Sequence, residues 1–140
     1  MTVETDNVAI LKRAYEDWDK SKGAGTDYLI AVFHNDVQFT SLADGAPDAV
    51  AFTSARKGKE DFLAYIDGLT RDWEMIFYRV DDYVAQGDRV VAIGSTSWRN
   101  KKTRKVVTTR KVDIWRMKNG KAIEFSEYYD TAKLIAAAQP

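Results

Sequence analysis

Two carboxylates late in the chain, Asp113 and Glu127, are the residues whose type and setting best suit them to chemistry. Asp113 stands in a strand-like run, 106–118, that also places Trp115 and Met117 at alternate positions. A carboxyl group held against such side chains is costly to ionise, so it can stay protonated and donate a hydrogen bond. That chemistry, general acid catalysis or stabilisation of an oxyanion, predicts a pocket around Asp113.

The turn between the last two predicted strands decides which side chains share a face of the sheet. We expect a three-residue loop, which pairs Asp113 with Phe125 and Lys111 with Glu127. A two-residue turn would shift the register by one residue and send Glu127 to the opposite face. The expected face consists of Asp113, Trp115, Met117, Ile123, Phe125, Glu127 and Tyr129. Lys111 and Glu127 could instead form a structural salt bridge near the sheet rim, whereas Asp113 has no obvious partner.

Aromatic residues are numerous enough to wall a pocket, since the chain has four tryptophans and seven tyrosines. At helical or strand spacing, however, aromatic residues are more often core than ligand contacts, so both readings stay open for the tryptophans. The tryptophans are Trp18, Trp73, Trp98 and Trp115. Tyr15 differs because a buried phenol needs a hydrogen-bond partner and could point at a ligand oxygen.

Several other kinds of site have little to build on. The chain has no cysteine, and His34 is its one histidine. Disulfides and thiol nucleophiles are therefore excluded, and neither a metal site nor a Ser-His-Asp triad is expected. No glycine-rich loop follows a predicted strand, so we expect neither a nucleotide nor any other cofactor.

The predicted elements place helices before most of the strands. The expected helices are a first one capped by Asp6, a short second one from residue 26 or 27 to 33, and a third over 58–72. The expected strands cover 37–41, 74–85, 90–100, 106–118 and 121–129. Residues 43–56 suit a long loop beside a pocket mouth, and 131–138 a last helical turn or two or a frayed end. Turns too short for parallel crossovers predict an antiparallel meander in an α+β fold.

Composition narrows the class of protein. The 140 residues predict one domain, 1–140, and a hydrophobic content of 45% fits a globular chain. Twenty-one basic residues balance 21 acidic ones, so no field draws the protein to nucleic acid or to an anionic membrane. The polar, acidic start and the lack of a long apolar segment favour a cytoplasmic location.

The run Lys111-Val112-Asp113-Ile114-Trp115-Arg116-Met117, followed by Asn119-Gly120-Lys121, resembles the NTF2-like (cystatin-like) superfamily, above all its SnoaL-like and ketosteroid isomerase-like proteins. The order of elements agrees with this resemblance, which covers nearly the whole chain. It implies a cone in which a curved antiparallel sheet and three N-terminal helices enclose a pocket for a small hydrophobic ligand. It also implies a homodimer formed through the outer face of the sheet.

The resemblance assigns roles to particular residues. Asp113 takes the place of a protonated aspartate that donates to an oxyanion, and Tyr15 that of the assisting tyrosine. Ser41 occupies the place of the general base, and since a serine hydroxyl accepts no proton at neutral pH, Glu127 is expected to act as the base from another direction. The candidate ligand contacts are Trp18, Ser41, Thr96, Trp98, Trp115, Phe125 and Tyr129.

Two functions are compatible with these residues. The first is a ketosteroid isomerase-like or SnoaL-like enzyme that performs acid/base chemistry, isomerisation or cyclisation, on a small hydrophobic carbonyl compound. The alternative is a non-catalytic protein that binds a small hydrophobic ligand in the same cavity. A protein–protein scaffold is a third possibility by analogy of fold. The sequence leaves open whether the chain is an enzyme.

Overall fold

Two helices open the chain, in a computed structural model that describes residues 2–42 and 56–140. α1 (Val3–Ser21) starts earlier than predicted, because Thr2 and Thr5 cap each other: each side-chain oxygen accepts the other residue's backbone N–H, at 2.9 and 3.1 Å. Asp6, the predicted cap, therefore lies in the first turn, where the helix dipole favours an acidic side chain. α2 (Asp27–Val32) follows.

The remaining elements are mostly strands. They are β1 (Phe33–Ser41), β2 (Arg56–Lys57), α3 (Lys59–Asp72), β3 (Trp73–Gln86), β4 (Arg89–Asn100), β5 (Val106–Lys118), β6 (Lys121–Tyr129) and α4 (Thr131–Ala138). The loop predicted beside the pocket mouth falls on 43–55, outside the described residues, and on Arg56. The tail is helical, and Asp130 caps α4 by accepting the backbone N–H of Lys133 at 3.0 Å.

Five long strands and the two-residue β2 form one sheet in the order β2-β1-β6-β5-β4-β3. The predicted meander is confirmed for β3 to β6, whose neighbours are antiparallel. The expectation of a wholly antiparallel sheet is wrong, because β1 pairs with β6 in parallel. These two strands are joined by α3 and the whole meander, a connection long enough for a parallel pair.

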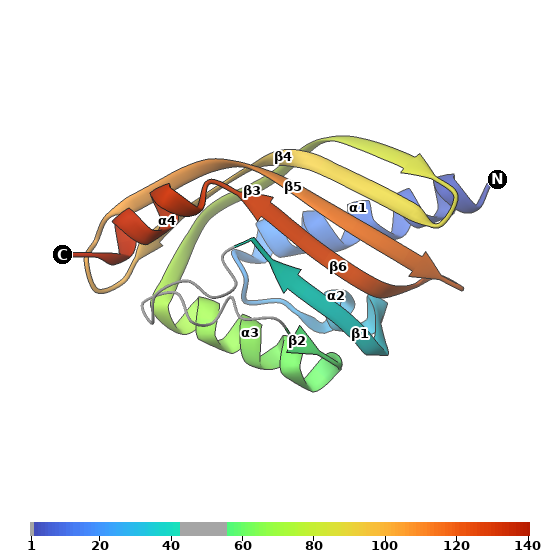
Figure 1. Cartoon of the computed structure of the whole chain (residues 1–140), viewed down its shortest axis with the longest axis horizontal. Helices are drawn as coiled ribbons and strands as arrows, with labels where there is room; N and C mark the ends of the chain where they lie inside the picture. Colours follow the sequence, from blue (N-terminus) through green and yellow to red (C-terminus); the bar gives the residue numbers. More distant parts are fainter. Residues whose placement is uncertain (1, 43–55) are drawn as a thin grey trace.

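The sheet curves around the first three helices (Figure 1), with α1 packed against β3 and α3 against β1 and β3. Its bend is marked by two register shifts between β3 and β4. At one of them Gly94 meets β3 so closely that a Cβ atom would lie 1.9 Å from the carbonyl oxygen of Arg79. A residue without a side chain is thus required there. α4 packs on β4 and β5 at one end of the sheet (Figure 1).

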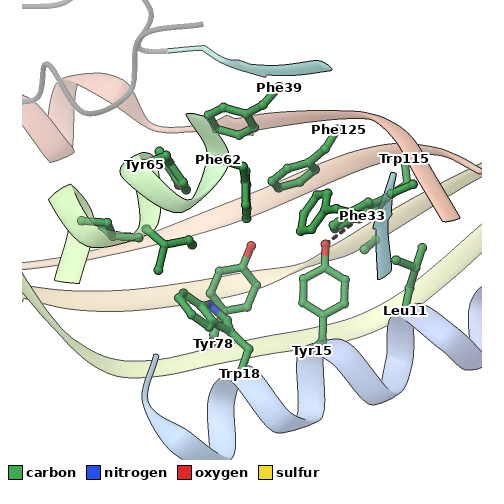
Figure 2. Close-up of a cluster of buried hydrophobic side chains, with 14 of the residues drawn as sticks. Leu11, Tyr15, Trp18, Phe33, Phe39, Phe62, Tyr65, Tyr78, Trp115 and Phe125 are labelled. Carbon is green, nitrogen blue, oxygen red and sulfur yellow. Dashed lines mark hydrogen bonds between the residues drawn. The ribbon is translucent and has the colours of Figure 1, made fainter. Parts of the chain in front are cut away.

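An aromatic cluster fills the space between the sheet and the helices (Figure 2). Trp115 and Phe125, neighbours across β5 and β6, stack with ring centroids 4.2 Å apart. The ring centroids of Phe33 and of Phe62 in α3 are 4.2 Å apart, and those of Phe39 and Phe125 are 5.2 Å apart. These rings fix the position of the strands that carry the candidate site.

Candidate functional site

The register of β5 and β6 differs from the predicted one, although most of the predicted face survives. Asn119 and Gly120 both adopt left-handed conformations, with φ of 51° and 76°, and form a two-residue turn. An extra residue in β6 at Ile123 then shifts the register, so that Asp113 lies opposite Glu127. The bulge restores the alternation, and Phe125, Glu127 and Tyr129 face the same side as Asp113. Ala122 rather than Ile123 is buried opposite Met117.

Lys111 is a buried cation between the two candidate carboxylates. Its Nζ atom donates hydrogen bonds to Asp113 Oδ1, at 2.9 Å, and to the hydroxyl of Tyr78, and it forms an ion pair with Glu127, whose Oε2 lies 2.9 Å away. The expected cross-strand pairing of Lys111 with Glu127 is wrong, because Lys111 lies opposite Tyr129, but the salt bridge considered between these two side chains is present and is buried rather than at the rim. The expectation that Asp113 lacks a partner is wrong. The charge of the ammonium group is therefore compensated by two carboxylates within the protein.

Asp113 accepts hydrogen bonds rather than donating one. The hydroxyls of Tyr15 and Tyr78 both donate to its Oδ2, at 2.5 and 2.6 Å. The indole N–H of Trp115 in turn donates to the Tyr15 hydroxyl at 2.8 Å (Figure 2), and Lys111 donates to that of Tyr78. Each tyrosine thus turns its own proton towards Asp113, so the geometry is that of a carboxylate acceptor. The proton-donor role that the family resemblance implied does not match this arrangement.

The protonation of the neighbouring groups follows from their burial. Burial, followed by the charge of Asp113, raises the pKa of both Tyr15 and Tyr78 well above 10. Burial, followed by the charge of Glu127, does the same for Tyr65. Burial lowers the pKa of Lys111, but the two carboxylates outweigh it and the pKa is raised well above 10.5. At neutral pH the site therefore holds neutral phenols and a charged lysine.

Glu127 is the carboxylate that reaches the cavity. Its Oε2 forms the ion pair with Lys111, while the hydroxyl of Tyr65 donates to the carboxylate, at 3.1 Å from Oε1 and 3.3 Å from Oε2. Its side chain is buried from bulk solvent, yet it belongs to the cavity wall. Since a carboxylate oxygen has two lone-pair positions, Oε1 retains capacity to accept a proton or a hydrogen bond from a bound molecule.

The cavity lies between the sheet and helices α1 and α3. The cavity has a volume of about 80 Å³. A water molecule needs roughly 10–15 Å³ of cavity volume, so several waters or a molecule of one or two rings would fill it. Its wall includes the predicted residues Tyr15, Trp18, Thr96, Trp98, Trp115, Phe125, Glu127 and Tyr129. Within the described residues, Asp113 lies behind this wall, and Ser41 reaches it through a 3.0 Å hydrogen bond to the Tyr129 hydroxyl.

Sequence reasoning missed several wall residues, chiefly Lys111, Tyr65 and Tyr78. The sequence could have identified Lys111, because residues two positions apart on a strand share a face and Lys111 lies two residues before Asp113. The two tyrosines had none, since their hydroxyls meet the carboxylates through contacts 35 and 62 residues apart in sequence.

The cavity is polar at one end and apolar at the other. Lys111 lies opposite Gly94 of β4, whereas Trp73 of β3 lies opposite Asn100, six residues further along the same strand. At about 3.3 Å per residue, this separation is roughly 20 Å of curved strand. Trp98 and Val107, which face each other across β4 and β5, line the cavity in the part near Trp73.

Within residues 2–42 and 56–140, no three side chains of the His, Cys, Asp or Glu type gather as metal ligands would. His34 is exposed and accepts the backbone N–H of Asp36 at 3.1 Å. Within the same ranges no helix combines the length and the apolar character needed to cross a membrane.

Comparisons with known proteins agree with this geometry. Residues 11–125 match the model of the SnoaL-like domain, whereas a comparison with curated proteins gives no match. An NTF2-like protein of unknown function from Burkholderia pseudomallei has a similar structure, with a TM-score of 0.79, 20% identity and 100% of both chains covered. A candidate SnoaL-like polyketide cyclase from a Jannaschia species has a TM-score of 0.75 and 16% identity, and the alignment covers 100% of this chain and 96% of that one.

A third solved structure adds a bound molecule. A protein with a ketosteroid isomerase-like fold from Catenulispora acidiphila, in complex with trimethylamine, has a TM-score of 0.73 and 14% identity. The alignment covers 92% of this chain and 91% of that one. At identities this low, these similarities concern the fold.

Proposed function

This chain belongs to the SnoaL-like domain family, as the sequence resemblance predicted, and we propose that its cavity binds a small, largely apolar carbonyl compound on which Glu127 performs acid/base chemistry. One observation carries the proposal: a carboxylate held by an ion pair with Lys111 and a hydrogen bond from Tyr65 lies on the wall of an aromatic cavity. A similar structure described as a candidate polyketide cyclase supports the same class of chemistry.

In the proposed reaction Glu127 removes a proton from the carbon next to the carbonyl group. The electron pair of the broken C–H bond forms a C=C bond, and the carbonyl π electrons move onto oxygen, so an enolate and a protonated Glu127 result. Return of the proton to another carbon isomerises the substrate. Attack of the enolate carbon on a second carbonyl closes a ring, and the proton then goes to the new alkoxide.

The donors around Glu127 fit this reaction. Before proton transfer, Tyr65 donates to the carboxylate and Lys111 forms an ion pair with it. A protonated carboxyl group attracts both groups less strongly, so the transfer makes the Tyr65 hydroxyl and the Lys111 ammonium group available to the oxyanion that forms at the same moment. Asp113 and Tyr15 then act as positioning residues, because Asp113 holds Lys111 and the tyrosine hydroxyls in place.

The test uses 2-tetralone, a two-ring ketone with acidic hydrogens beside its carbonyl group. We expect the wild-type protein to accelerate exchange of these hydrogens for deuterium in D₂O, followed by NMR, and E127Q to lower the protein-catalysed rate by roughly 100-fold or more. E124Q is the matched control, because Glu124 lies on the same strand but is exposed and pairs with Arg116. It should exchange 2-tetralone at the wild-type rate.

The same experiment separates the enzyme from the non-catalytic alternative. The contacts of Lys111 with Asp113, Glu127 and Tyr78 favour a rigid binding site as well as a catalytic one. Binding of 2-tetralone by calorimetry without accelerated exchange would therefore support a binding protein and refute the catalytic proposal. Equal exchange rates in the wild type and E127Q would remove Glu127 from the mechanism.

A further inference from the structure

The C-terminal helix α4 closes one end of the cavity. Of the described wall residues, Leu134 alone belongs to this helix, and it is 8% exposed. α4 packs on β4 and β5 at the end of the sheet that lies away from the β5–β6 turn (Figure 1). The cavity therefore ends, on this side, at a side chain that the sequence places at the end of the chain.

Hydrogen bonds fix α4 at both of its ends. At the start of the helix, Thr109 Oγ1 of β5 accepts the backbone N–H of Asp130 at 3.0 Å. At its end, the hydroxyl of Thr103 donates to the carbonyl oxygen of Ala137 at 2.5 Å. A helix of eight residues is too short to be stable alone, so these contacts with the rest of the protein hold it in place. Leu134 thus has a fixed position on the cavity wall.

The position of Leu134 is far from the charged groups of the cavity. Because α4 is bonded to β5 at its start and to the β4–β5 turn at its end, its middle lies over Val107, another wall residue. Val107 precedes Lys111 by four residues on β5, which is roughly 13 Å at about 3.3 Å per residue. A ligand whose carbonyl group lies beside Glu127 and Lys111 therefore directs its opposite end towards Leu134.

The neighbours of Leu134 on α4 cannot take over its place. Ile135 is partly buried but is not a wall residue, and residues 136–138 are alanines. A smaller side chain at position 134 would therefore lengthen the cavity, and a larger one would shorten it. A charged group of the ligand at this end would lie among apolar side chains without a counter-charge, which is costly.

We propose that Leu134 is a specificity-determining residue that sets the length of the ligand. This inference rests on the proposed function, because it places the carbonyl end of the ligand at Glu127. It deepens that function by defining the substrate class: an elongated, uncharged carbonyl compound whose remote end is hydrocarbon. Leu134 selects among such compounds without touching the atoms that react.

The test uses a series of acetophenones that carry a straight alkyl chain of one to eight carbons opposite the acetyl group. In calorimetry the affinity of the wild type should rise about fourfold with each CH₂ group until the chain meets Leu134, and then stop rising. L134A removes three carbons, so this break should move to a chain about two carbons longer. L134F should move the break to a shorter chain.

I135A is the matched control. It removes the same number of carbon atoms from the next residue of α4, but from a side chain that is not on the cavity wall. Its break should stay at the wild-type chain length, even if the lost packing lowers the stability of the helix. A shift caused by loosening of α4 would appear in both variants, whereas a shift caused by the space at position 134 appears in L134A alone.

The same break in L134A as in the wild type would overturn the proposal, and so would affinity that rises along the whole series in the wild type. If L134A does not fold, an unchanged break in L134F has the same meaning. The break is a property of binding and is measured separately from deuterium exchange. A break that shifts in a protein without exchange supports this inference and refutes the catalytic proposal, and exchange with an unshifted break does the reverse.

Discussion

Replacement of Lys111 by methionine should destabilise the protein more than any other single charge removal. Methionine fills a similar volume but leaves Asp113 and Glu127 without the ammonium group that lies 2.9 Å from each. The side chains of the three residues are 9%, 2% and 3% exposed, so water cannot replace the lost cation. Removing one partner of a buried ion pair costs about 3–5 kcal/mol. K111M should lose at least that much free energy of unfolding.

A surface pair of the same chemistry provides the control. Lys22 Nζ lies 3.0 Å from Asp19 Oδ1, nearly the same distance, but these side chains are 49% and 39% exposed. Solvent screens such a pair, so K22M should cost no more than about 1 kcal/mol. The comparison shows how much more a buried lysine with two carboxylate partners contributes than an exposed lysine with one.

The assay is urea unfolding at pH 7, followed by tryptophan fluorescence. A deficit no larger than that of K22M would refute the reasoning.

Three further predictions concern the fold around the site. G94A should lower the free energy of unfolding in urea by about 3 kcal/mol, because its Cβ atom would lie 1.9 Å from the backbone of β3. G87A is the control: no atom lies near the new Cβ, but the φ of +58° disfavours alanine, so the loss should be about 1–2 kcal/mol. Y15F should cost about 1–3 kcal/mol in a thermal melt, since it leaves a buried carboxylate one donor short; an unchanged melt would mean that this hydrogen bond contributes nothing. Alkaline titration should show full stability up to about pH 10 and a loss above it. Burial raises the pKa of the cavity tyrosines. Burial lowers the pKa of Lys111, but the two carboxylates outweigh it and raise that pKa. The folded protein therefore keeps protons that the unfolded chain releases. Stability that stays constant to pH 12 would contradict these shifts.

The sequence alone determined the elements and most of the site's face. The 3.6-residue period of the apolar positions predicts α1 and α3, and the alternation in 106–118 and 121–129 predicts that Asp113 and Glu127 face inward. Both signals are local, since they follow from the geometry of one helix or one strand. The two-residue turn and the bulge at Ile123 were missed because either register preserves that local alternation up to the turn.

Tertiary structure decided which groups meet and therefore which can react. Tyr15 donates to Asp113 across 98 residues of sequence, and the curvature of the sheet brings the hydroxyl of Tyr65 to Glu127. These contacts make Asp113 an acceptor behind the wall and leave Glu127 as the carboxylate on the cavity. The position of Leu134 on the cavity wall is likewise a property of the packed structure, because the residues of the tail do not determine which strands α4 packs against.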